Sequence, residues 1–387
     1  MSGFIKLTSL AIDLILLLIC PCATASSNLP DDVPINDEAG RGGLLILKVQ
    51  VVDGTELPFL VDTGSPVTFF DTSLESKLGK RLSTGHFRHF GVKHKSNIYA
   101  APKLYLNGSR LLTGGRVWID DFKELHVLSG HPTMGIIGMD CLRHYCLQLD
   151  FGAKKLRFLN PDQIDATRLG KRYPIRFSFP VRSPFIHARG FFGQKEPRLL
   201  VDTGYVADGA LTAQAKQAGG LDTETEYASL SECTWNSGTY TDLLIGHDGN
   251  LVGLRFLARH LVTLDFPNRS MYLKQTTSGP LNGDRFIQME TTANSAGDSA
   301  HDFLEGLKKA GHLPRWTADE NGTSEAALQF HYFDIYPITA TFNVRKNQDT
   351  SVYRYTLVQA AKDAQWVLQR AWLTDQNGTV IEEFPVR

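Results

Sequence analysis

Short runs of alternating hydrophobic and polar residues recur over the first 280 residues and predict a protein built mainly of β-strands. Residues 44–52 and 58–61 form two such runs, and Asp53-Gly54 between them is typical of a hairpin turn. Similar runs at 147–151 and 262–266 predict further strands. Helical spacing in this region extends over one or two turns at most, so the fold class that the pattern predicts is mostly β.

The pattern changes at about residue 285. The spacing of the apolar residues predicts a helix over 299–310, with Gly311 as its stop signal. Three strand-like segments follow, at 336–344, 351–360 and 366–374. This part of the chain is therefore expected to form a separate, small α+β domain.

An internal repeat relates the two halves of the β-rich region. Residues 45–72 and 185–212 align at a shift of 140 without a gap, and eight of the 28 positions are identical. About two matches are expected by chance at ordinary residue frequencies. Five of the eight form the run Leu-Val-Asp-Thr-Gly, which ends at Gly64 in one copy and at Gly204 in the other.

A second match supports the same duplication. At a shift of 115, Ile137-Gly138 aligns with Val252-Gly253, and the similarity continues into the strand that follows each pair. Surface loops absorb a difference in length of this kind. We therefore expect two copies of one unit, at about residues 43–160 and 172–276.

Each copy contains an Asp-Thr-Gly tripeptide at the end of an apolar strand, at residues 62–64 and 202–204. A single tripeptide of this kind usually marks only a strand end and a turn. Two of them at equivalent places, each with an apolar-Gly pair downstream, resemble the retropepsin-like and pepsin-like aspartic proteases. The closest similarity is to bacterial retropepsin-like proteins that carry both lobes in one chain, and it covers roughly residues 43–276.

The resemblance implies two retropepsin-like β-barrel lobes that form one unit, with Asp62 and Asp202 as the catalytic pair. Two carboxyl groups a few ångströms apart cannot both ionise cheaply, so such a pair holds one proton. The ionised member takes a proton from a water molecule and the protonated member donates to the scissile carbonyl. This chemistry requires no metal and no organic cofactor.

The resemblance also implies roles for the residues next to the two aspartates. Thr63 and Thr203 are expected to hydrogen-bond across the interface between the lobes. Gly64 and Gly204 are expected to allow close backbone approach and unusual φ values.

Further support is expected on the far side of each loop. Ile137-Gly138 and Val252-Gly253 are expected to hold the two loops from behind. Ser65 is expected to hydrogen-bond the carboxylate of Asp62. Tyr205 departs from the small residue usual at this position, which leaves the tuning of Asp202 open.

A substrate-covering flap is expected between each Asp-Thr-Gly and its downstream glycine. The candidate regions are residues 86–106 in the first copy and 227–240 in the second. Trp235, in the second region, could line a substrate pocket or belong to the core.

Composition narrows the choice of partners. The chain has 40 Lys and Arg against 41 Asp and Glu, and it lacks a basic block, which disfavours nucleic acid and anionic membranes as partners. Five cysteines in 387 residues do not make a disulfide scaffold. Cys141, Cys146 and Cys233 are expected to be buried thiols. The expected partner is a peptide or protein substrate.

The first 25 residues read as a secretion signal. Leu14–Cys20 is apolar but too short to span a bilayer, and Ala23-Thr24-Ala25 suits cleavage before Ser26. A retained membrane anchor is the alternative. The preferred interpretation is an exported protein, periplasmic or extracellular, that is not inserted in a membrane after cleavage.

These observations predict an exported aspartic endopeptidase. A catalytically silent relative that binds peptides is the second hypothesis, and a structural or adhesive secreted protein is the third. Dimerisation is not required because one chain supplies both aspartates, and a chain ending near residue 280 is expected to fold and stay active. The expected boundaries are 1–25 for the signal peptide, 26–42 for a linker or short propeptide, 43–165 and 170–280 for the two lobes, and 285–387 for the C-terminal domain.

Overall fold

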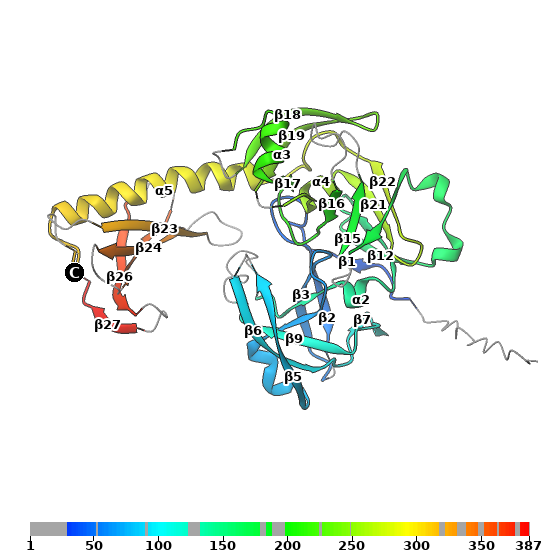
Figure 1. Ribbon diagram of the computed structural model, residues 1–387, viewed down its shortest axis with the longest axis horizontal. Coiled ribbons are helices and arrows are strands. Elements are labelled where there is room, and N and C mark those ends of the chain that lie inside the picture. The colour runs from blue at the N-terminus through cyan, green and yellow to red at the C-terminus, as the bar shows by residue number, and fades with distance from the viewer. Residues whose placement is uncertain are drawn as a thin grey trace, which may run out of the picture.

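The structure is a computed structural model of the 387-residue chain. It describes residues 29–51, 53–89, 92–122, 132–178, 183–187, 198–223, 227–247, 249–316, 322–330, 338–346, 352–361, 364–375 and 380–386. The expected signal peptide therefore lies outside the described residues. Figure 1 shows a β-rich body and, joined to it through the long helix α5, a smaller unit with a sheet of its own.

The first part of the body is a nine-stranded sheet in the order β5-β6-β9-β4-β10-β3-β2-β7-β8. The hairpin expected at Asp53-Gly54 is present, since β2 and β3 pair antiparallel around Gly54, whose φ is 84°. The sheet comprises β2 (Ile46–Gln50), β3 (Glu56–Val61), β4 (Phe69–Asp71), β5 (Arg81–His89), β6 (Val92–Ala100), β7 (Tyr105–Leu106), β8 (Ser109–Arg110), β9 (Arg116–Asp120) and β10 (Gly135–Ile137). The 3₁₀ helix η1 (Thr72–Lys77) follows β4, and the short helix α2 (Met139–Leu142) follows β10.

The second part is a seven-stranded sheet in the order β14-β15-β16-β20-β17-β19-β18. It comprises β14 (Arg176–Phe177), β15 (Pro184–His187), β16 (Arg198–Val201), β17 (Gly209–Ala210), β18 (Ala228–Trp235), β19 (Gly238–Gly246) and β20 (Leu251–Val252). Its helices are α3 (Ala213–Ala218) and α4 (Leu254–Leu257). The 3₁₀ helices η2 (Pro161–Gln163) and η3 (Ala166–Arg168) lie in the connection between the two parts.

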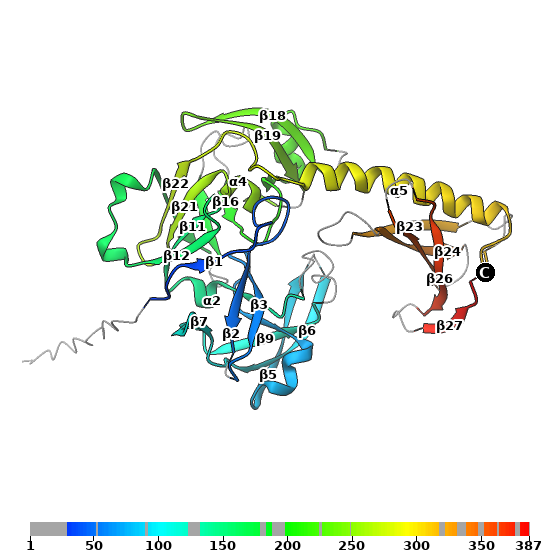
Figure 2. The ribbon, with the colours of Figure 1, turned by 180° about the vertical axis from the view of Figure 1, so that it is seen from behind.

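Both parts contribute equally to a third, six-stranded sheet in the order β1-β12-β11-β21-β22-β13. The first part supplies β1 (Val33–Pro34), β11 (Cys146–Asp150) and β12 (Lys155–Leu159), and the second supplies β13 (Lys171–Pro174), β21 (His260–Asp265) and β22 (Ser270–Gln275). At its centre β11 pairs antiparallel with β21, and the buried side chain of Gln148 donates to Thr263 Oγ1 at 3.1 Å. Figure 2 shows this sheet from behind, with β1 and β12 close to β21 and β22.

The pairing register is the same in the two parts once residues are shifted as the sequence match requires. Val33 pairs with Leu156, and Tyr173, which lies 140 residues after Val33, pairs with Met271, which lies 115 residues after Leu156. The correspondence therefore begins near Val33 in the first copy, about ten residues earlier than expected, and near Tyr173 in the second, close to the expected start. We call residues 33–159 repeat 1 and residues 173–274 repeat 2.

The C-terminal unit consists of α5 (Phe286–Lys309) and a five-stranded antiparallel sheet in the order β23-β24-β25-β26-β27. Its core joins Ala296, Ala300 and Leu304 of the helix to alternate residues of the strands, such as Phe342 and Tyr355. The strands are β23 (Gly322–Phe330), β24 (Ile338–Lys346), β25 (Val352–Gln359), β26 (Val367–Thr374) and β27 (Val380–Phe384).

The mostly-β fold class is confirmed, and so is an α+β arrangement at the C-terminus. The helix expected at 299–310 is longer than expected, because α5 begins at Phe286. Strand β23 was not expected. No helix in the described ranges is both long and apolar enough to cross a membrane.

Candidate active site

The two Asp-Thr-Gly loops follow equivalent strands and are held in the same way. Strand β3 ends at Val61 beside the parallel strand β10, and the backbone amide of Asp62 donates to Ile137 O at 3.1 Å. In repeat 2, β16 lies beside the parallel strand β20, and the amide of Asp202 donates to Val252 O at 3.0 Å. Each aspartate thus starts its loop from a fixed position in a sheet.

The two loops bring the carboxyl groups of Asp62 and Asp202 together at the junction of the repeats. A Cβ atom placed on Gly64 would lie 2.6 Å from Asp202 Oδ2, and one on Gly204 would lie 2.6 Å from Asp62 Cγ. The expected close approach at the two glycines is therefore confirmed. The expectation of unusual φ values was wrong, because neither glycine has a left-handed φ angle.

Backbone amides surround both carboxyl groups. Asp62 Oδ1 accepts the amides of Gly64 at 2.7 Å and Ser65 at 3.0 Å. Asp202 Oδ1 accepts the amide of Gly204 at 2.9 Å. Burial among protein atoms and the adjacent charge of Asp62 nevertheless raise the pKa of Asp202 well above its ordinary value. The pair is thus arranged to hold a proton.

Thr63 and Thr203 lock the loops to one another. The amide of each threonine donates to the hydroxyl of the other, at 3.0 Å for Thr63 N and 3.1 Å for Thr203 N. Each hydroxyl donates onward to the opposite strand, to Val201 O at 2.6 Å and to Val61 O at 2.7 Å. Both side chains are fully buried, and the cross-interface role expected of them matches this geometry.

The downstream glycines lie directly behind the loops. At Gly138 a Cβ atom would collide with Val67 O, and at Gly253 with Ala207 O. The helix that begins after each glycine also binds the loop, since Met139 N donates to Ser65 O at 2.8 Å. The support expected of Ile137-Gly138 and Val252-Gly253 agrees with these contacts.

Of the two residues that follow the Asp-Thr-Gly tripeptides, Ser65 differs from the expectation. The hydroxyl of Ser65 donates to Val67 O at 2.8 Å, so Asp62 is bonded by the Ser65 amide and not by its side chain. The Tyr205 side chain turns away from Asp202, because its hydroxyl occupies the place where Gly246 would carry a Cβ atom. The backbone amide of Tyr205 bonds the Asp202 carboxyl group.

Two long hairpins occupy the regions expected to hold flaps. In repeat 1, β5 and β6 form one, and Phe87 on β5 packs against Phe69 at 4.9 Å and Trp118 at 6.2 Å between ring centroids. Its residues 90–91 lie outside the described residues. In repeat 2, β18 and β19 form the other.

Trp235 belongs to the core and not to a substrate pocket. It is 3% exposed at the end of the β18–β19 hairpin and stacks on Tyr173 with ring centroids 4.9 Å apart. The turn is fastened as well, because Asn236 Nδ2 donates to the Tyr173 hydroxyl at 2.5 Å. The tip of this hairpin is thus attached to repeat 2.

Sequence reasoning missed a second pair of equivalent residues behind the loops. In repeat 1 the Thr68 hydroxyl donates to Asp140 Oδ1 at 2.7 Å. The equivalent residues of repeat 2 are Asp208 and Arg255, which form a fully buried ion pair. The shifts of 140 and 115 would have paired these positions, but the residue types differ between the copies and no identity marks them.

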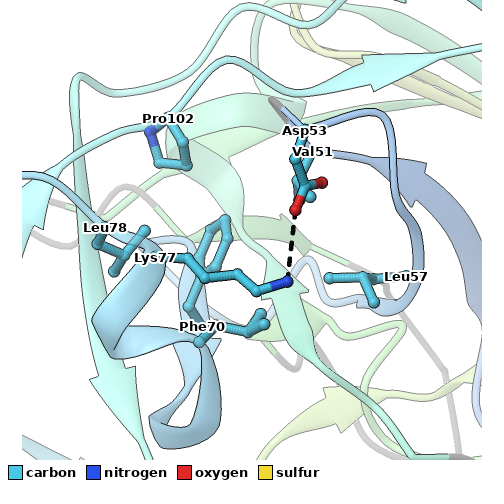
Figure 3. A pocket seen from close by; sticks show the side chains of 8 residues that line it. Val51, Asp53, Leu57, Phe70, Lys77, Leu78 and Pro102 are labelled. Carbon is cyan, nitrogen blue, oxygen red and sulfur yellow. Dashed lines mark hydrogen bonds and ion pairs between the residues drawn. The ribbon is translucent and has the colours of Figure 1, made fainter.

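A well-formed pocket lies elsewhere in repeat 1. It encloses about 290 Å³, and the Lys77–Asp53 ion pair, with Nζ and Oδ2 3.3 Å apart, crosses it (Figure 3). Its lining is mainly apolar and includes none of the residues expected at the active site. The pocket residues are Val51, Asp53, Leu57, Phe70, Leu74, Lys77, Leu78 and Pro102.

Three cysteines lie in the described part of the chain, and no disulfide joins any of them. Cys141 and Cys146 are buried as expected, but Cys233 is half-buried, so the expectation of a buried thiol was wrong there. Burial raises the pKa of Cys146 to about 12, so its thiol stays protonated and inert at neutral pH. No known family model matches this chain, and a search of curated proteins found no match.

Proposed function

We propose that the protein is an aspartic endopeptidase in which Asp62 and Asp202 activate one water molecule. The observation that carries the proposal is the symmetric meeting of the two aspartates, with Gly64 against Asp202 and Gly204 against Asp62. We also propose that repeats 1 and 2 are retropepsin-like lobes, which the shared six-stranded sheet and the equivalent registers support.

The proposed roles follow from the surroundings of each carboxyl group. Asp62, whose Oδ1 accepts two amides, is the ionised member and takes a proton from water. Asp202, whose pKa is raised, is the protonated member and donates to the carbonyl oxygen of the scissile bond. The water attacks the carbonyl carbon, which gives a tetrahedral intermediate. As its C–N bond breaks, the proton taken by Asp62 passes to the departing amine and Asp202 takes a proton back from a hydroxyl of the intermediate, which restores the pair.

Preorganisation supports catalysis as opposed to binding alone. The threonine bonds fix the relative position of the loops before any substrate arrives, and fixed polar groups in a desolvated site contribute strongly to catalysis. The β5–β6 hairpin is held over repeat 1 by Phe87, Phe69 and Trp118. We assign to this hairpin the covering of the substrate.

The second candidate is a peptide-binding protein that does not cut. The Tyr205 hydroxyl beside Gly246 is the observation that favours it, because a bulky side chain directed there replaces the small residue usual after the second aspartate loop. Cleavage of a diverse peptide library between pH 3 and pH 7 decides between the candidates. The wild type should cut, Asp202→Asn should not, and Asp53→Asn, at an exposed ion pair, should cut like the wild type.

A further inference from the structure

The segment that leaves repeat 2 for the C-terminal unit is fastened to the body before α5 begins. We call residues 281–286 the junction segment. Arg41 Nε donates to Asn282 O at 3.0 Å, and the amide of Arg285 donates to Arg41 O at 3.0 Å. In both views the helix α5 starts at repeat 2 and leads to the C-terminal sheet (Figures 1 and 2).

Asp284 of the junction segment completes a buried cluster of charges. Its Oδ2 accepts Arg255 Nε at 2.8 Å, and the two side chains are 6% and 0% exposed. Arg255 and Arg259 both bind Asp208, which is also fully buried. Two guanidinium groups thus face two carboxylates, and removing Asp284 leaves an uncompensated positive charge where water does not reach.

Arg255 stands on the helix that holds the loop of Asp202. The first residues of α4 and Gly253 before it donate three backbone bonds to this loop. They run from Leu254 N to Tyr205 O at 2.7 Å, from Arg255 N to Ala207 O at 3.3 Å and from Gly253 N to Asp208 O at 2.9 Å. A shift of the Arg255 side chain is therefore transmitted to the loop through the backbone of α4.

Phe286, the first residue of α5, makes a second contact with the same loop. It is buried in a small cluster with Ala207 and Leu244, against which Tyr205 and Tyr227 pack. The rings of Phe286 and Tyr227 meet edge to face, with centroids 5.1 Å apart. Tyr205, the residue that departs from the expected pattern, thus packs against the cluster that holds the start of α5.

The equivalent positions of repeat 1 make no such outward contacts in the described residues. Ser65 bonds Val67 O within its own loop, and Thr68 bonds Asp140. At the corresponding positions repeat 2 has Tyr205, Asp208 and Arg255. Arg255 joins Asp208 to Asp284 of the junction segment, and Tyr205 packs against the cluster that contains Phe286. The three differences between the repeats therefore share one structural explanation.

We propose that Asp284 and Phe286 are positioning residues for Asp202, so that attachment of the C-terminal unit sets the geometry of the second catalytic loop. The catalytic part of this inference rests on the proposed endopeptidase function; the coupling itself does not. It assigns to the C-terminal unit a contribution to the activity of repeat 2.

Hydrogen exchange of the full-length protein tests the coupling without any substrate. Asp284→Asn and Phe286→Leu should each raise exchange of the amides at residues 202–208 about tenfold, because local opening becomes easier. Exchange at 62–68 should stay as in the wild type. Asp284→Glu, which keeps the charge, should restore most of the protection, and the exposed Asp53→Asn is the matched control.

Activity gives the second readout. Asp284→Asn should lower kcat about tenfold at unchanged KM and displace one limb of the pH profile, because Asp202 loses its fixed position. A wild type without activity would refute the endopeptidase, while the exchange data would still decide the coupling. Equal exchange changes in both loops, or none at 202–208 in either variant, would overturn the inference.

Discussion

Thr63 and Thr203 donate their backbone amides to one another's hydroxyl groups, at 3.0 and 3.1 Å, although 140 residues separate them in the chain. Each hydroxyl donates a hydrogen bond to a carbonyl of the opposite repeat. Four buried polar groups of the backbone thus depend on two side chains. The two aspartates meet because this network holds their loops in register.

Replacing either threonine by valine should destabilise the protein to a similar extent. Thr203→Val leaves Val61 O and Thr63 N buried without their partner, and each such group costs about 1–3 kcal/mol. Urea denaturation should therefore report a loss of at least about 2 kcal/mol for Thr63→Val and for Thr203→Val. Thr203→Ser keeps the hydroxyl and should lose far less; equal losses for serine and valine would contradict the network.

The stability of the protein should depend on pH through Asp202. Folding raises the pKa of this carboxyl above its ordinary value near 3.8, so the folded state binds the proton more tightly than the unfolded chain. The group therefore lowers stability at a pH above its raised pKa, and the effect disappears as the pH falls toward the unfolded value. Burial and the Asp62 charge are the causes.

Asp202→Asn should consequently be more stable than the wild type at pH 7, by about 1 kcal/mol, as is common when an unfavourable functional group is removed. The difference should close near pH 4. Paired denaturation curves at the two pH values measure it. A variant less stable than the wild type at pH 7 would show that burial does not penalise this carboxylate.

Much of the body could be predicted because the repeat and the strand pattern are local features of the sequence. The Asp-Thr-Gly loops, the hairpin at Asp53-Gly54 and the short helix after Gly138 all follow from motifs a few residues long. The earlier start of the repeat at Val33 was missed, since β1 is only two residues long and the only identities there are Pro34 with Pro174 and Ile35 with Ile175.

The rest of the site depends on contacts that no local pattern reveals. Asp208, Arg255 and Asp284 come together from distant parts of the chain, and each alone reads as an ordinary surface charge. The side chain of Tyr205 could be recognised as unusual, but not that its hydroxyl lies beside Gly246 and that it packs against the cluster containing Phe286. Tertiary packing decides such positions.

Because of the charge cluster, the C-terminal unit can be removed only beyond the junction segment, and not near residue 280 as the sequence suggested. A chain ending at residue 280 lacks Asp284 and Phe286, and breaking a buried ion pair costs about 3–5 kcal/mol. We expect this chain to be insoluble or strongly destabilised, and one ending at residue 292 to be folded. Thermal unfolding of both proteins tests this, and equal stability would show that the junction segment adds nothing to repeat 2.

A single chain should suffice for activity, because both aspartates and both threonines of the network belong to one molecule. Specific activity should stay constant over a dilution series from about 10 μM to 10 nM, and a weak dimer would dissociate within this series. Sedimentation at the same concentrations gives the state of the protein. Activity that falls in step with dissociation would place the working site between two chains.

The central claim is that Asp62 and Asp202 act as one unit, and the rate of peptide-bond cleavage as a function of pH tests it most directly. The wild type should give a bell-shaped profile with an acidic optimum, because one carboxyl must be ionised and the other protonated. Asp62→Asn, Asp202→Asn and the double variant should all be inactive to about the same degree, since residues that act together are not additive. Cleavage at the wild-type rate by either single variant would contradict the account.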